Sequence, residues 1–107
     1  MSFNPEYSNH PPTPEEISLL SGLTLLEFGS PRCSFCQAVE PMVEEVMNSY
    51  KKIPHLKIYD GKGKKLGRSF KVKLWPTLIA LKHGQEISRL IRPNNTDEVR
   101  VFFDSFK

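Results

Sequence analysis

A nearly unbroken apolar run from Leu23 to Gly29 is followed four residues later by Cys33, the first of the only two cysteines of the chain, and then by the second, Cys36. Such a run, interrupted by Glu27 alone, is typical of a central strand that is buried on both faces. Behind the cysteines, apolar residues recur at spacings of three and four, which predicts a helix over about residues 34–50. The cysteines therefore stand where a buried strand passes into a helix.

Capping residues and periodicity indicate the remaining elements. Pro41 lies inside the predicted helix and should bend it or make it begin afresh. The order predicts an α/β fold in which a small, mixed central sheet of four strands is flanked by about four helices on both faces, with its first two strands parallel. We expect further helices over residues 14–21, 64–71 and 95–106, and further strands over residues 55–60, 77–82 and 86–91.

The N-terminal arm, residues 1–12, is rich in proline and poor in apolar residues, so we expect it to be extended or poorly ordered. Phe3 and Tyr7 offer an alternative, in which the arm joins the sheet as a fifth, edge strand. Residues 13–107 then form one domain, because a chain of 107 residues has no room for a second.

Composition excludes several classes of function. No apolar run approaches the roughly 20 residues that cross a bilayer, and the start lacks the pattern of a secretory signal, so we expect a cytoplasmic protein without a membrane partner. The net charge of +3 comes largely from one basic stretch, where Phe70 is the lone interleaved aromatic, so we predict a solvated face and no nucleic-acid partner. The basic residues are Lys62, Lys64, Lys65, Arg68, Lys71 and Lys73.

Two cysteines three positions apart are usually catalytic or metal-binding in a reducing cytosol. The orphan N–H groups at a helix start favour a thiolate at Cys33, and Arg32 adds a neighbouring cation. Cys36, one turn further on, is placed to attack a mixed disulfide formed at Cys33. Two alternatives stay open, a pair of inert buried thiols and half of a zinc site. A closed zinc site needs four ligands, for which the chain adds only the scattered His10, His55 and His83.

Several segments together resemble thioredoxin and thioredoxin-like proteins. They are the stretch Leu25 to Cys36, the helix proline Pro41, the segment Trp75-Pro76-Thr77 with the Leu-Ile-Ala-Leu-Lys-His-Gly that follows it, and the closing amphipathic helix. The resemblance covers about residues 14–107 in matching order, and it implies the thioredoxin-like fold for this α/β chain.

The resemblance also implies roles for individual residues. Cys33 would be the attacking thiol, Cys36 the resolving thiol, and Glu27 the buried acid that carries the proton of Cys36. The residues alone leave Glu27 open between that placement and a strand-end carboxylate in water, and its side chain is one methylene longer than the family's usual aspartate. Pro76 matches the family's cis-proline. The expected substrate-binding residues are Arg32, Ser34, Phe35, Trp75, Pro76 and Thr77.

Three departures from the family pattern touch the substrate groove. Arg32 replaces the tryptophan that usually precedes the first cysteine, Ser34-Phe35 replaces Gly-Pro, and the usual glycine after the fourth strand falls near Arg92-Pro93. Trp75 is expected to restore the missing aromatic surface from the opposite side, with a plain core tryptophan as the alternative.

The function implied is that of an enzyme, a thiol-disulfide oxidoreductase that reduces protein disulfides and serves electron transport and cell redox homeostasis. Its cofactor would be no more than the redox-active disulfide of Cys33 and Cys36, without a metal. We expect a monomer whose partners are protein disulfide substrates and an NADPH-dependent thioredoxin reductase. A disulfide oxidase or isomerase is the alternative enzyme, because the dipeptide between the cysteines sets the redox poise. A non-catalytic protein-binding module is the alternative from another class.

Overall fold

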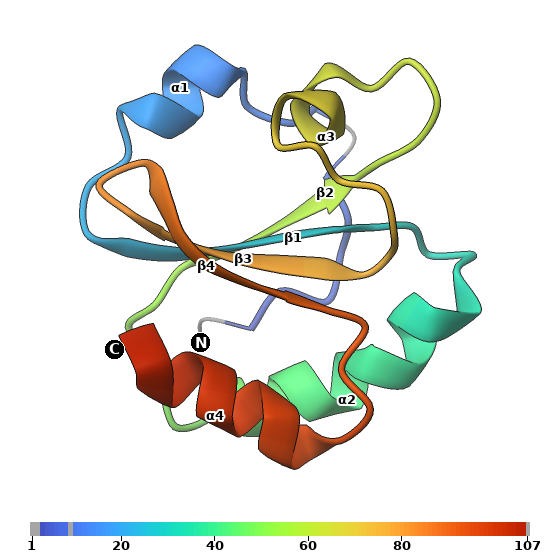
Figure 1. Ribbon diagram of the computed structural model, residues 1–107, viewed down its shortest axis with the longest axis vertical. Helices are drawn as coiled ribbons and strands as arrows, with labels where there is room; N and C mark the ends of the chain where they lie inside the picture. Colours follow the sequence, from blue (N-terminus) through green and yellow to red (C-terminus); the bar gives the residue numbers. More distant parts are fainter. Residues whose placement is uncertain (1–2, 9, 107) are drawn as a thin grey trace.

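The computed structural model describes residues 3–8 and 10–106, and in them a mixed sheet lies between two layers of helices (Figure 1). The strands stand in the order β2-β1-β3-β4, with β1 parallel to β2 and antiparallel to β3. The predicted four-stranded mixed sheet with four helices is thereby confirmed. In chain order the elements are α1 (Pro14–Ser18), β1 (Leu23–Gly29), α2 (Ser34–Met47), β2 (His55–Tyr59), α3 (Lys65–Ser69), β3 (Thr77–Lys82), β4 (Gln85–Ile91) and α4 (Thr96–Phe106).

The helices pair off on the two faces of the sheet. Figure 1 shows α1 and α3 on one face and α2 with α4 on the other. Leu25 on β1 contributes to the core beneath α2 and α4, and its neighbour Leu26 contributes to the core beneath α1 and α3. The continuous apolar run of β1 is explained by this arrangement, because successive side chains of a strand point to opposite faces and both faces are covered.

Two helix ends differ from the predicted ones by more than two residues. α1 ends at Ser18 and α2 ends at Met47, each three residues earlier than expected. After α2 the chain continues in tighter turns, where the Tyr50 amide donates to the Met47 carbonyl at 3.0 Å, so the apolar periodicity outlasts the helix. Pro41 is accommodated within α2, which runs on through it.

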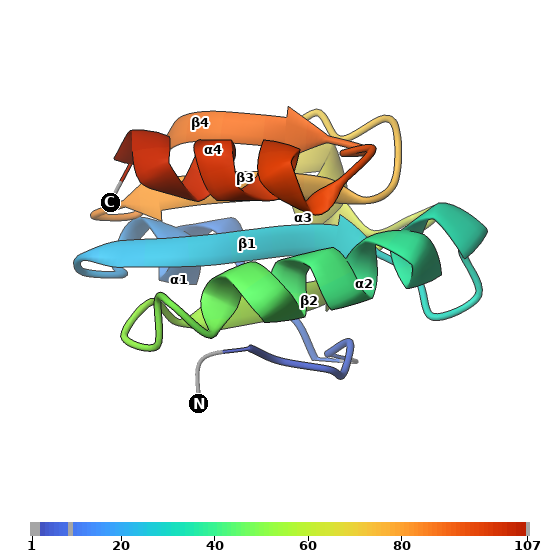
Figure 2. The ribbon, with the colours of Figure 1, turned by 90° about the horizontal axis from the view of Figure 1, so that it is seen from below.

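The N-terminal arm runs beside the outer edge of β2 (Figure 2). Ser8 and Ile58 form one isolated parallel bridge, so the described part of the arm adds no fifth strand to the sheet. Phe3 is buried in the core beneath α2 and α4. Met1, Ser2, Asn9 and Lys107 lie outside the described residues, and so do the predictions that fall on them.

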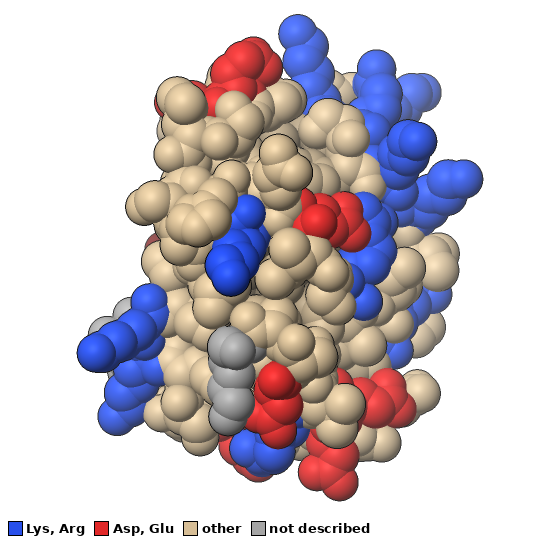
Figure 3. All heavy atoms as spheres, turned by 60° about the vertical axis from the view of Figure 1, so that its left-hand side comes forward, with Lys and Arg blue, Asp and Glu red and all other residues tan. Residues whose placement is uncertain are grey.

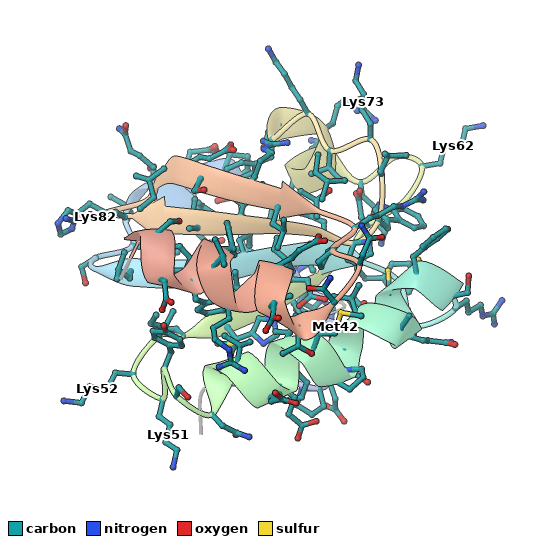
Figure 4. All side chains as sticks on the ribbon, turned by 60° about the horizontal axis from the view of Figure 1, so that its bottom comes forward. Met42, Lys51, Lys52, Lys62, Lys73 and Lys82 are labelled. Carbon is teal, nitrogen blue, oxygen red and sulfur yellow. The ribbon has the colours of Figure 1, made fainter. Side chains whose placement is uncertain are left out.

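The basic stretch around α3 is exposed to solvent. All six of its lysine and arginine side chains are exposed, and Figure 4 shows Lys62 and Lys73 extending outward from the segments that flank α3. Figure 3 shows lysine and arginine side chains gathered along one border of the face in view. In the described part of the chain, no helix has the length and apolarity required to span a bilayer.

Candidate active site

The two cysteines occupy the N-terminus of α2, as the sequence predicts. Cys33 is the N-cap residue, with an extended backbone, and its Sγ accepts a hydrogen bond from the Cys36 N–H at 3.2 Å. The Cys33 side chain is partly exposed, whereas Cys36 is 2% exposed. A sulfur that accepts a backbone N–H at a helix N-terminus is better able to hold negative charge. The pair thus presents one accessible sulfur with a second one directly behind it.

Burial separates the second thiol chemically from the first. Desolvation raises the pKa of Cys36 from its ordinary 9.0 to about 12, and its hydrogen bond with Cys33 acts in the same direction. The Ser30 backbone and the Tyr7 hydroxyl lower the pKa of Cys36, but by less than burial raises it. At neutral pH Cys36 is therefore a protonated thiol that must lose its proton before it can act as a nucleophile.

Glu27 is buried at 1% exposure, which decides between the two placements that the sequence leaves open. Its Oε1 lies 2.7 Å from Nε2 of His55, and its Oε2 has no hydrogen-bond partner among the described residues. The backbone N–H of Asn4 donates to Nδ1 of His55 at 2.9 Å, so a neutral His55 carries its proton on Nε2 and donates it to Glu27. The buried acid is thus held by a histidine that the N-terminal arm orients.

A buried lysine lies next to this pair. Lys57 is 2% exposed, and its Nζ donates to Oε1 of Glu40 at 2.7 Å and to the carbonyl of Pro5 at 3.2 Å. The same ammonium lies 4.4 Å from the ring centroid of Tyr7 and 5.8 Å from that of Phe3. These contacts stabilise the positive charge of Lys57, whose burial would otherwise be energetically costly.

The segment Trp75-Pro76-Thr77 leads into β3, and the Trp75–Pro76 peptide bond is cis. Trp75 is half-buried, and its indole N–H donates to the buried carboxylate of Asp60 at 2.9 Å. Thr77 is buried, and its hydroxyl donates to the Leu74 carbonyl at 2.6 Å. The Trp75 ring is therefore tied to the end of β2 by a polar contact and differs from a plain core tryptophan.

Arg92 connects this segment with the residues between the cysteines. Its Nε donates to the Trp75 carbonyl at 2.7 Å, and its guanidinium carbon lies 4.0 Å from the centroid of the Phe35 ring. The Arg92 N–H also donates to the Pro76 carbonyl at 3.1 Å. Phe35 and Trp75, both predicted to bind substrate, are thus brought together by a third side chain. Arg92 has a φ of 47°, a backbone conformation that favours glycine, which fits the family's usual glycine near this position.

The other predicted groove residues, Arg32 and Ser34, flank Cys33 with exposed side chains. A cavity of about 400 Å³ opens on the opposite side of the cysteines, where Tyr7, Ser30, Cys36, Glu40 and Tyr59 contribute to its lining. Within residues 3–8 and 10–106, no group of three or more His, Cys, Asp and Glu side chains is placed to hold a metal ion.

Sequence reasoning missed Tyr7, His55 and Lys57 as members of the site. An ionisable residue within an apolar strand, such as Lys57, signals a buried partner, but it does not name the partner. The contacts of Tyr7 join segments about fifty positions apart in the chain, a separation at which local patterns carry no information. Arg92 was visible only as a departure from the family's glycine.

Comparisons with known proteins agree with this geometry. The thioredoxin family profile matches residues 14–105. The thioredoxin of Chlamydia pneumoniae is 32% identical over 76 residues, which cover 68% of this chain and 72% of that protein. Thioredoxin H-type of Fagopyrum esculentum is 26% identical over 69 residues, 64% of this chain, and the chain spans 50% to 60% of the length of three plant thioredoxins.

Among solved structures, thioredoxin 2 from Pseudomonas aeruginosa PAO1 in its reduced form is similar over 92% of both chains, with a TM-score of 0.86 and 44% identity. Thioredoxin NaTrxh from Nicotiana alata shares the fold over 88% of this chain and 81% of that chain, with a TM-score of 0.73 and 22% identity. The profile match over most of the chain, together with a cysteine pair at the start of α2, shows that this protein belongs to the thioredoxin family.

Proposed function

We propose that the protein is a thiol-disulfide oxidoreductase that reduces disulfides of other proteins through Cys33 and Cys36. The observation that carries this proposal is the asymmetry of the pair. The Cys33 sulfur is accessible and accepts a backbone N–H at a helix N-terminus, while Cys36 is buried one turn behind it. Membership of the thioredoxin family and the similarity to a reduced thioredoxin 2 support the same chemistry.

The reaction has two exchanges. The Cys33 thiolate attacks one sulfur of the partner's disulfide, that S–S bond breaks, and the partner's other sulfur leaves as a thiolate. Cys36 then loses its proton and attacks the Cys33 sulfur, which forms the Cys33–Cys36 disulfide and releases the second partner sulfur as a thiolate. The partner's disulfide gains two electrons, and the two cysteines of this chain lose them.

The groove beside Cys33 is proposed to hold the partner's backbone and side chains. Pro76 and Thr77 border this groove, Phe35 offers a ring that is 52% exposed, and Arg32 and Ser34 offer polar groups. Trp75 belongs to the same groove, where Arg92 fixes its carbonyl. The exposed lysines and arginines around α3 would attract partners with acidic surfaces.

The proposed partners follow from the family resemblance. An NADPH-dependent thioredoxin reductase would return the Cys33–Cys36 disulfide to the dithiol, and the protein would act as a cytoplasmic monomer in electron transport and redox homeostasis. Light scattering on the purified protein tests the monomer. Turnover of a test disulfide with NADPH and a thioredoxin reductase, compared with turnover on dithiothreitol, tests the donor.

Substitution of each cysteine tests the activity itself. The Cys33→Ser variant should lose reduction of a protein disulfide, because the attacking sulfur is absent, and the Cys36→Ser variant should accumulate a mixed disulfide on Cys33. Partner proteins that the Cys36→Ser variant holds in this mixed disulfide can be released by reduction and identified by mass spectrometry. Full activity of the Cys33→Ser variant would end the proposal. An equilibrium potential measured against glutathione then separates a reductase from an oxidase or isomerase.

A further inference from the structure

The N-terminal arm delivers a tyrosine hydroxyl to the buried sulfur. The arm is fixed along β2 by a hydrogen bond from the Ser8 N–H to the Lys57 carbonyl at 2.8 Å, and by the Asn4 N–H on the His55 ring. Between these anchors, the Tyr7 ring lies under the Lys57 ammonium. The ring is therefore held from both ends of the arm and by the strand beneath it.

Two atoms converge on the backbone of Gly29 at the end of β1. A Cβ atom at Gly29 would lie 2.7 Å from Sγ of Cys36 and 2.9 Å from the Tyr7 hydroxyl oxygen, so both atoms border the same Cα hydrogen. The Tyr7 hydroxyl and the Cys36 sulfur therefore lie beside each other, and each of them changes the pKa of the other. The close approach requires glycine at position 29, because any side chain there would displace one of the two groups.

A hydrogen bond between these two groups has only one possible direction once Cys36 is ionised, because a thiolate carries no proton and can only accept. Desolvation raises the pKa of Tyr7 far above 10.0, the charge of Glu27 adds to the rise, and the bond with Cys36 raises it further. The same bond lowers the pKa of Cys36. The hydroxyl thus stays protonated and can donate a hydrogen bond to the sulfur, and this interaction is stronger when the sulfur is charged.

We propose that Tyr7 is a catalytic residue of the resolving step, in which its hydroxyl donates a hydrogen bond to the Cys36 sulfur and stabilises the thiolate that attacks Cys33. This inference rests on the proposed oxidoreductase function and adds a residue to it. The charged and titratable groups facing the hydroxyl are Cys33 and Cys36 from α2, Glu27 from β1 and Lys57 from β2.

The step balances without a further reactant. The Cys36 thiol loses its proton, which Glu27 is predicted to carry to solvent, and the resulting thiolate forms the bond to Cys33. The departing partner thiolate takes up a proton from solvent. Tyr7 neither gains nor loses a proton overall. Its contribution, alongside that of the Ser30 backbone, is to lower the free energy of a buried anion, and a hydrogen bond to a charged group has its largest effect in such a place.

A conservative substitution isolates the hydroxyl. The Tyr7→Phe variant keeps a ring under the Lys57 ammonium and removes the donor alone. Tyr59→Phe is the matched control, because Tyr59 lines the same cavity and, within the described residues, makes no hydrogen bond to either sulfur. Its ring lies 5.4 Å from the Lys64 ammonium. Both variants are assayed by rapid mixing with a peptide disulfide, which resolves formation of the mixed disulfide from its decay.

The expected result is that Tyr7→Phe slows decay of the mixed disulfide about tenfold and leaves its formation unchanged, since Cys33 attacks before Cys36 is needed. Tyr59→Phe should change neither rate. An unchanged decay rate in Tyr7→Phe would overturn the proposal. Equal slowing of both phases would overturn it as well, because that is the signature of a general loss of structure.

A second measurement is independent of turnover. In the Cys33→Ser background, alkylation of Cys36 by iodoacetamide at pH 9 reports the fraction of thiolate, and adding Tyr7→Phe should slow it about tenfold. If the parent protein reduces no disulfide but Tyr7→Phe still slows alkylation, the proposed function fails while the assigned hydrogen bond stands. An alkylation rate that does not depend on Tyr7 would reject the assigned role by itself.

Discussion

Between pH 8 and pH 10 the unfolded chain gains a negative charge at Cys36 that the folded, reduced protein does not. The thiol titrates near 9.0 in the unfolded chain, and burial raises its pKa to about 12 in the folded protein. A raised folded-state pKa gives stability that is fully present below pH 9 and is lost as the pH rises toward 12. At pH 10 about nine in ten unfolded molecules carry the thiolate, and few folded ones do.

The magnitude follows from the linkage relation. At pH 10, one unit above the pKa of the Cys36 thiol in the unfolded chain, the titration of this thiol lowers the free energy of unfolding by about 1.4 kcal/mol. At pH 8 it lowers the free energy of unfolding by about 0.1 kcal/mol. We therefore expect Cys36 alone to remove about 1.3 kcal/mol between the two pH values. The loss should be confined to the reduced protein, because the Cys33–Cys36 disulfide has no thiol to titrate.

Urea unfolding at pH 8 and pH 10 measures this loss, with a phosphine reductant to keep both thiols free. The control is Cys36→Ala, which retains the other titrating groups, including Tyr7, and should lose about 1.3 kcal/mol less than the reduced wild type. If wild type and Cys36→Ala lose the same free energy between the two pH values, burial does not hold the Cys36 proton as the structure indicates.

Two further substitutions test the packing around the site by urea unfolding. A Cβ atom at Gly67 would lie 2.1 Å from Oδ1 of Asp60, so Gly67→Ala should destabilise the protein by about 1–3 kcal/mol, while the control Gly61→Ala, whose Cβ meets nothing closer than 4.0 Å, should be nearly neutral. Equal effects would contradict the close contact. His55→Ala should cost about 3 kcal/mol, because it leaves the Glu27 carboxylate buried without its partner, and a loss under about 0.5 kcal/mol would argue against the pair.

Local signals were enough to predict the framework of the site. Three patterns could each be read from a few neighbouring residues: the apolar run of β1, the periodicity of α2 and the position of Cys33 between them. The folded protein has the strand, the helix and the cysteine in these places. The predicted ends of α1 and α2 were wrong by three residues, because apolar side chains in the following turns still pack on the core. Periodicity reports which side chains are buried, and a tight turn can bury them as well as a helix.

The polar partners could not be predicted, because each one depends on how distant segments meet. Glu27 and His55 are adjacent only because β1 and β2 pair in a register that places the two side chains together. The arm reaches the site through contacts between residues 51 and 52 positions apart. Because the arm is poor in apolar residues, the sequence gave little reason to expect that Tyr7 would lie beside the Cys36 sulfur.

The accessibility of the two cysteines determines which of them reacts first with a partner disulfide. On one side of the cysteines, Tyr7 of the arm lies beside Cys36, and on the other side the Arg92 guanidinium lies against the Phe35 ring and the Trp75 carbonyl. A partner disulfide approaching the groove therefore meets the partly exposed Cys33 first. Cys36 becomes useful only after that sulfur has formed a bond, because its pKa of about 12 keeps it protonated in the resting protein. Because the Cys36 thiol is mostly protonated, it seldom forms the disulfide with Cys33 before a partner has bound. A hydrogen-bond donor beside Cys36 then stabilises the thiolate that resolves the mixed disulfide.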